Sequence, residues 1–108
     1  MGEKYWIQDL ATGLDRLRIH FRTQHGQVII IVVIQYEAYI DGKWRAIVRF
    51  DEAHGFFHRD VMSPTGEQEK TPLPSTDKQH TLNEAIVYLK ENWRTYRQRY
   101  EEKYYGRN

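Results

Sequence analysis

The sequence predicts an α+β fold, an antiparallel β-meander of four to five strands with one long C-terminal helix packed on one face. Three observations predict it. The chain has 108 residues, which suits a single domain with one core. Apolar residues alternate along much of residues 14–71, with turn signals between the runs. Residues 81–105 then change to helical spacing and contain no glycine or proline.

The first 13 residues are expected to form an irregular arm or one short helix. Trp6, Ile7 and Leu10 have helical spacing, and Gly13 is suited to end such a helix. Strict alternation starts at Leu17, so the first strand is expected to begin near that residue and to end before a turn at Thr23–Gly26.

The longest strand is expected at about Gln27–Tyr39. Residues 28–34 of this strand are all apolar, which is typical of a central strand covered on both sides. The following hairpin is predicted to have a three-residue loop closed by Tyr39 and Lys43, with Gly42 in the left-handed conformation. That register sets Glu37 against Arg45, a favourable cross-strand charge pair.

Two further strands are expected, at about Phe56–Met62 and, as a short edge strand, at Glu67–Thr71. A loop over 72–80 leads to the helix. Thr81 is predicted as its N-cap in a capping box, and Gly106 as its stop. The predicted core face combines strand residues with one helix stripe: Leu17, Ile19, Phe21, Val28, Ile30, Val32, Ile34, Tyr36, Trp44, Ala46, Val48 and Phe50, with Leu82, Ile86, Leu89 and Trp93.

Composition narrows the class of protein. The net charge of +1 argues against a strongly basic nucleic-acid binder, and the absence of cysteine excludes disulfides and cysteine-based zinc sites. The apolar run 28–34 is far shorter than the roughly 20 residues of a membrane span. With no signal-peptide pattern at the N-terminus, the expectation is a soluble, cytoplasmic protein with no membrane partner.

The most informative segment is 50–60, with the sequence FDEAHGFFHRD. His54 and His58 are suited to act as general acid and base, because imidazole titrates near neutral pH. Asp51 or Asp60 would orient an imidazole, and Arg59 would hold a phosphate or another oxyanion. These five residues are the predicted catalytic groups of a ribonuclease that needs no metal and no other cofactor.

Two other interpretations of this segment remain open. His54, His58 and one aspartate also match the ligands of a mononuclear metal site. In a purely structural loop, the imidazoles would bond to the backbone and Arg59 would pair with an aspartate. The two histidines would lie about 13 Å apart on a straight strand. Either chemical role therefore requires a bend, which Gly55 would permit.

Basic residues suggest where RNA would bind. The expected contacts with phosphates come from one sheet face and from the helix: Arg16, Arg18, Arg22, Arg45, Arg49, Arg94 and Arg97. The alternative for the sheet face is simple solvation. The helical stripe of Trp93, Tyr96 and Tyr100 is interpreted as core or as a dimer seam.

An apolar stripe is expected on the same face as the sheet arginines, at Ile29, Ile31, Val33 and Ile47. It would need a cover, for which we expect the N-terminal arm together with a second subunit. The sequence therefore favours a homodimer.

The segment Trp44–Asp60 resembles a small family of uncharacterised prokaryotic proteins and, more distantly, the TumE-type toxins of toxin–antitoxin modules. The residues that carry the resemblance are Asp51, His54, Gly55, His58, Arg59 and Asp60. The resemblance implies a prokaryotic cytoplasmic toxin that acts on RNA and is neutralised by an antitoxin protein. The alternative function is a non-enzymatic interaction module, either a homodimer or an antitoxin-like partner.

Overall fold

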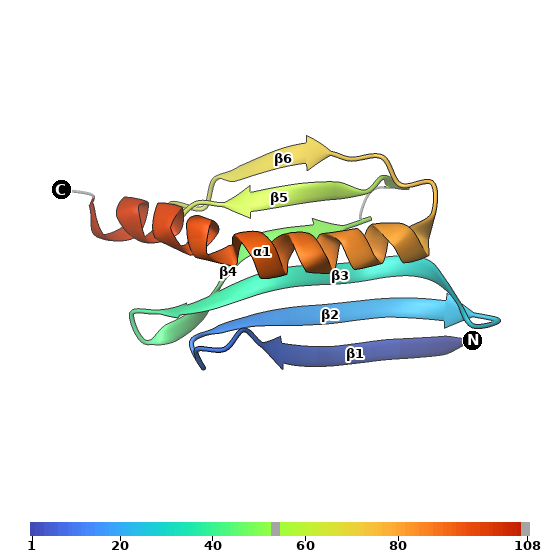
Figure 1. The fold of residues 1–108 in the computed structure, drawn as a ribbon. Helices are drawn as coiled ribbons and strands as arrows, with labels where there is room; N and C mark the ends of the chain where they lie inside the picture. The colour runs from blue at the N-terminus through green and yellow to red at the C-terminus, as the bar shows by residue number, and fades with distance from the viewer. Residues whose placement is uncertain (53–54, 107–108) are drawn as a thin grey trace.

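The computed structural model describes residues 1–52 and 55–106. A six-stranded antiparallel sheet runs in chain order, and one long helix lies across one of its faces (Figure 1). The α+β class is thus confirmed, with six strands in place of four to five. The elements are β1 (Gly2–Asp9), β2 (Asp15–Gln24), β3 (Gln27–Ile40), β4 (Lys43–Asp51), β5 (His58–Met62), β6 (Gln68–Pro72) and α1 (Lys78–Tyr105).

The additional strand is β1, which replaces the expected arm or short helix. It pairs with β2 along its whole length, from Gly2 opposite Thr23 to Asp9 opposite Arg16. Most of its residues are exposed, so no single buried face marks it as a strand in the sequence. Trp6 packs edge-on against Phe21 on the face that also carries the helix, and does not cover the opposite face.

Strand β3 contains two irregularities that the alternating pattern did not reveal. The register with β2 shifts between His20 and Phe21 and again between Arg22 and Thr23. Each shift adds a residue to β3 and reverses which side chains face the helix. As a result Ile31 is buried opposite Phe21, whereas Ile30, predicted for the core, is exposed. The expected apolar stripe on the outer face is broken up, because Ile31 and Ile47 both join the core.

The β3–β4 hairpin also differs from the prediction. Its loop has two residues, Asp41 and Gly42, both with positive φ, and Ile40 pairs with Lys43. This arrangement twists in the same sense as the strands. A register shift between Tyr36 and Glu37 then sets apolar residues opposite each other, with Tyr36 against Val48 and Ile34 against Phe50. Glu37 therefore lies opposite Ala46 and not opposite Arg45.

Helix α1 begins one turn earlier than predicted. Asp77 is the N-cap, and its carboxylate accepts hydrogen bonds from the backbone amides of Gln79 and His80. Thr81 is instead a buried residue of the first turn that accepts a hydrogen bond from Ser75. The predicted stop at Gly106 is confirmed. No helix in residues 1–52 and 55–106 is both long and apolar enough to cross a membrane.

The helix packs mainly on β3 and β4 (Figure 1). Trp93 and Tyr100 are buried there, and the ring of Trp93 lies 5.9 Å from that of Tyr36. The interpretation of the aromatic stripe as core is confirmed, because these residues are part of the one hydrophobic cluster.

A buried polar knot ties the far end of the helix to the sheet. Arg97 donates to Asp15 at 2.6 Å and to the backbone oxygens of Leu14 and Tyr39. The hydroxyl of Tyr36 donates to the same Asp15 oxygen at 2.5 Å. Burial, reinforced by this bond, raises the pKa of Tyr36, so its hydroxyl stays protonated.

Candidate metal centre

Strands β4 and β5 bring three residues of the 50–60 segment together. Asp51 pairs with His58 across the two strands, and Asp60 follows two residues later on the same side of β5. Their neighbours Phe50 and Arg59 pair with each other and face the helix. Asp51, His58 and Asp60 therefore lie on the sheet face opposite the helix.

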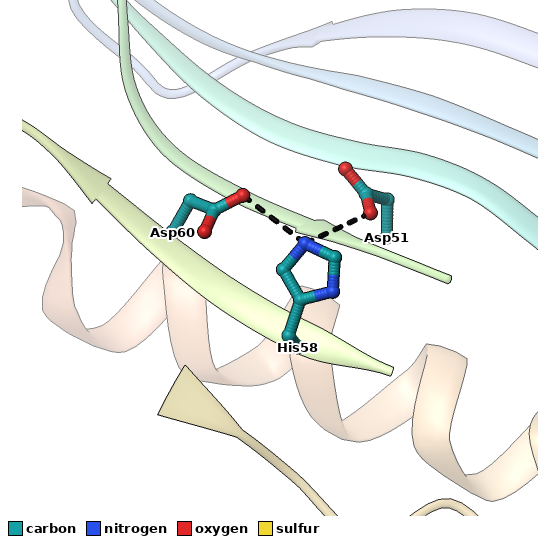
Figure 2. A group of neighbouring side chains, drawn as sticks. All are labelled: Asp51, His58 and Asp60. Carbon is teal, nitrogen blue, oxygen red and sulfur yellow. Dashed lines mark hydrogen bonds and ion pairs between the residues drawn. The ribbon is translucent and has the colours of Figure 1, made fainter. Parts of the chain in front are cut away.

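The imidazole of His58 lies between the two carboxylates (Figure 2). Its Nε2 is 3.1 Å from Asp51 Oδ1 and 3.1 Å from Asp60 Oδ2. All three side chains are largely buried, and His58 is only 1% exposed. Two carboxylates at this depth need a positive charge beside them, because burying them unpaired would be costly.

The hydrogen bond of the second ring nitrogen, Nδ1, determines which nitrogen of the neutral His58 ring carries the hydrogen. Nδ1 lies 3.2 Å from the carbonyl oxygen of Phe56. Because a carbonyl only accepts, this bond places a hydrogen on Nδ1 and leaves the Nε2 lone pair of the neutral ring directed at the two carboxylates. Such an arrangement is stable only with a cation at Nε2, either a proton, an ammonium group or a metal ion.

Lys70 on β6 supplies one such cation. Its ammonium nitrogen is 3.0 Å from His58 Nε2 and 3.3 Å from Asp60 Oδ1. The side chain of Lys70 is 40% exposed, so it can rotate away from the cluster without breaking core packing. Sequence reasoning missed Lys70, although opposite charge on the edge strand pairing with β5 was an available signal.

The three donor atoms also fit a metal ion. They lie within 4.8 Å of one another, and two of the three separations are 3.1 Å. Neighbouring ligands about 2.1 Å from one metal are themselves separated by about 3 Å. A backbone carbonyl bonded to the other nitrogen is the usual support of a metal-binding histidine. This set differs from the predicted one, because it uses both aspartates with His58 alone.

Glu52 follows Asp51 in the chain and links this end of β4 to β3 and to the start of α1. Its carboxylate accepts a hydrogen bond from the backbone amide of Ile31 at 2.9 Å and binds the ammonium group of Lys78 at the start of α1. Sequence reasoning gave Glu52 no role, since its two partners are distant in the chain.

Arg59, another of the predicted catalytic residues, does not join this cluster. Arg59 faces the helix, where its guanidinium carbon lies 5.6 Å from the ring of Tyr88. His54 falls outside the described residues. The kink at Gly55, with φ of 85°, is present. Arg59 and His58 thus serve opposite faces of β5.

The predicted RNA-binding arginines are mostly engaged within the protein. Arg16 and Arg18 donate to Glu37 at 2.7 and 2.9 Å, and Arg49 donates to Gln35 at 2.7 Å. Others contact groups on neighbouring elements: Arg22 pairs with Glu3, Arg45 donates to the backbone of Ile40, and Arg97 belongs to the polar knot. Arg94 is exposed on the helix.

Comparison with known proteins places the chain in a family. Residues 1–105 match the model of a domain of unknown function, DUF7718. The chain belongs to the DUF7718 family. No significantly similar protein was found among curated proteins or among solved structures.

Proposed function

We propose that this DUF7718 protein binds a divalent transition metal through Asp51, His58 and Asp60 and uses it to hydrolyse RNA, as a small prokaryotic toxin-like enzyme. The observation that carries the proposal is the geometry at His58. Its Nε2 is oriented by a backbone carbonyl and lies 3.1 Å from each of two buried carboxylates. This departs from the predicted metal-independent mechanism, in which His58 acts as a general acid or base, because its Nε2 lies between two carboxylates.

The donor set selects the kind of metal. One imidazole nitrogen with two carboxylate oxygens suits Mn²⁺ or Zn²⁺ better than Mg²⁺ or Ca²⁺, which prefer oxygen ligands alone. Three protein ligands leave coordination positions for water and substrate, as in hydrolytic sites. A metal held there would lower the pKa of a bound water so that it attacks a phosphodiester, while the ester oxygen leaves and takes up a proton.

RNA is proposed as the substrate on the strength of the sequence motif. Asp51, His58 and Asp60 are three of the six residues that carry the resemblance to the uncharacterised prokaryotic family and, more distantly, to the toxins. An antitoxin that neutralises the protein and a cytoplasmic location belong to the same proposal.

Metal binding provides the first test. We expect Asp60→Asn to weaken Mn²⁺ binding at least about tenfold, because an amide oxygen is a poorer ligand than a carboxylate. Isothermal titration calorimetry with Mn²⁺ measures this effect. Glu69→Gln is the matched control, since it removes an exposed carboxylate from the neighbouring edge strand. Equal Mn²⁺ affinity of wild type and Asp60→Asn would refute the metal centre.

The Lys70→Met substitution tests the same metal centre, and here the expected change is a higher affinity for Mn²⁺. A metal must displace the ammonium group now beside Nε2, so we expect its removal to strengthen Mn²⁺ binding by about tenfold. Weaker binding by the Lys70→Met variant would show that Lys70 supports the site and does not compete for it.

Activity requires its own experiment. Induced expression of the wild type is expected to arrest bacterial growth and degrade cellular RNA, whereas Asp60→Asn is expected to do neither while still folding, as its circular dichroism spectrum would show. Glu69→Gln is expected to remain toxic. Mn²⁺ binding without any effect on growth or RNA would leave the metal centre in place and reject the RNA-directed function.

Strand β1 favours a second candidate function, a protein-interaction module. Tyr5 and Ile7 are 55% and 47% exposed on an edge strand that has β2 on one side only. Exposed apolar edge strands readily pair with another chain. The buried Trp93 and Tyr100 are unsuitable as interface residues, which moves the expected contact from the helix to β1.

The interaction module makes a distinct prediction. Ile7→Lys is expected to convert a dimer to a 13.1 kDa monomer in size-exclusion chromatography with light scattering. Lys90→Ala, on the exposed side of the helix, serves as the control. A wild-type protein that is already a monomer at high concentration would exclude the homodimer.

A further inference from the structure

A cavity lies on the face of the sheet opposite the metal centre. It has a volume of about 560 Å³ and is bounded by the first half of α1, by β4 and β5, and by the segment that leads to the helix. This volume is in the range of small-molecule sites. Its walls are largely apolar, formed by Phe50, Phe57, Leu73, Pro74, Ala85 and Val87.

Arg59 is the one arginine among the residues that line this cavity. Its guanidinium group lies against the ring of Tyr88, and its Nε is buried without a hydrogen-bond partner in the described part of the chain. No carboxylate of the described residues forms an ion pair with Arg59. A buried charged donor without an acceptor costs free energy, so an anion from outside would be favoured here.

Charges at the edge of the cavity limit the kind of anion. Glu84 and Glu91 line it together with His80, and Glu84 lies 3.1 Å from His80. The two glutamates would repel a doubly charged phosphate more strongly than a singly charged carboxylate. The apolar walls require that the rest of the ligand be apolar as well.

From these features we infer that the cavity binds a small monocarboxylate with an aromatic or branched aliphatic body. The carboxylate accepts hydrogen bonds from Arg59, and the apolar body lies among Phe50, Phe57 and Leu73. The site is independent of the proposed function, because it uses the face of β5 that does not carry His58.

The test titrates 4-phenylbutyrate into the labelled full-length protein and monitors binding by two-dimensional NMR. Saturable shifts are expected for the Arg59 Nε–H signal and for the backbone amides of Phe57 and Tyr88. Two comparisons isolate the charge: the neutral 4-phenylbutanamide, and the Arg59→Gln variant. Each is expected to reduce the affinity by about tenfold or more, as for loss of a charge-assisted hydrogen bond.

Two controls separate binding from misfolding. Arg22→Gln removes an exposed arginine on the far side of the sheet and is expected to leave the affinity unchanged. Arg59→Gln should lower the thermal transition only slightly, since its Nε has no bond to lose and the substitution gives up only the stacking on Tyr88. Phenylbutyrate and its amide binding equally well, or shifts confined to other parts of the protein, would overturn the inference. Tighter binding of phenyl phosphate than of phenylbutyrate would overturn the assignment to a monocarboxylate.

Discussion

Replacing Arg97 with methionine is expected to lower the free energy of unfolding by about 3 kcal/mol, the low end of the range for breaking a buried ion pair. Asp15 is 3% exposed and Arg97 18%, so solvent screens their interaction little. The substitution leaves the Asp15 carboxylate with the Tyr36 and Thr12 hydroxyls but without a cation. It also removes the donors to the backbone oxygens of Leu14 and Tyr39.

Urea denaturation followed by circular dichroism measures this effect. Arg94→Met is the matched control on the same helix, because Arg94 is exposed and stacks on Trp93. Its expected cost is below about 1 kcal/mol. A double-mutant cycle with Asp15→Asn isolates the pair. Equal losses for Arg97→Met and Arg94→Met would show that the polar knot contributes nothing specific.

Glu37→Gln is expected to have the second large effect, a loss of about 2 kcal/mol. Glu37 is buried on the outer face, where it accepts hydrogen bonds from Arg16, Arg18 and Gln35. Removing its charge leaves two guanidinium groups close together without a counter-ion. Glu3→Gln on the exposed edge strand is the control and should change the denaturation midpoint little.

The pH dependence of stability should change with the same substitution. Burial by itself raises the pKa of the Glu37 carboxyl, but hydrogen bonds from Arg18, Arg16 and Gln35 outweigh it and hold the pKa below its ordinary value of 4.5. The contribution of the Glu37 carboxylate to stability is therefore complete above about pH 4.5. It is lost as the pH falls through the lowered pKa that this carboxyl has in the folded state. The free energy of unfolding, measured at a series of acidic pH values, should depend less on pH for Glu37→Gln than for wild type. An equal pH dependence of the two proteins would contradict the assignment.

The candidate site illustrates how one strand can serve two faces. His58 and Arg59 are adjacent in the sequence, and the sequence analysis assigned both to one catalytic group. Neighbouring residues of a strand point to opposite sides of its sheet. His58 therefore joins Asp51 and Asp60 on the outer face, whereas Arg59 lines the cavity beside the helix.

The sequence by itself determined the fold class, the long C-terminal helix and the segment that holds the candidate site. Apolar periodicity is a local property, and the stripe of Leu82, Leu89, Trp93 and Tyr100 shows it without knowledge of any partner. Density of titratable groups is equally local. Asp51, His58 and Asp60 could be named for that reason.

Only the tertiary structure decided the registers and hence the composition of the site. The irregularities in β3 and β4 change which residues face the helix, and they depend on how neighbouring strands fit together. Strand β1 gains its order from pairing with β2, because its own side chains are exposed on both faces. Lys70 contacts His58 across the pairing of β5 with β6, twelve residues apart in the chain, and the contact depends on the register of these two strands.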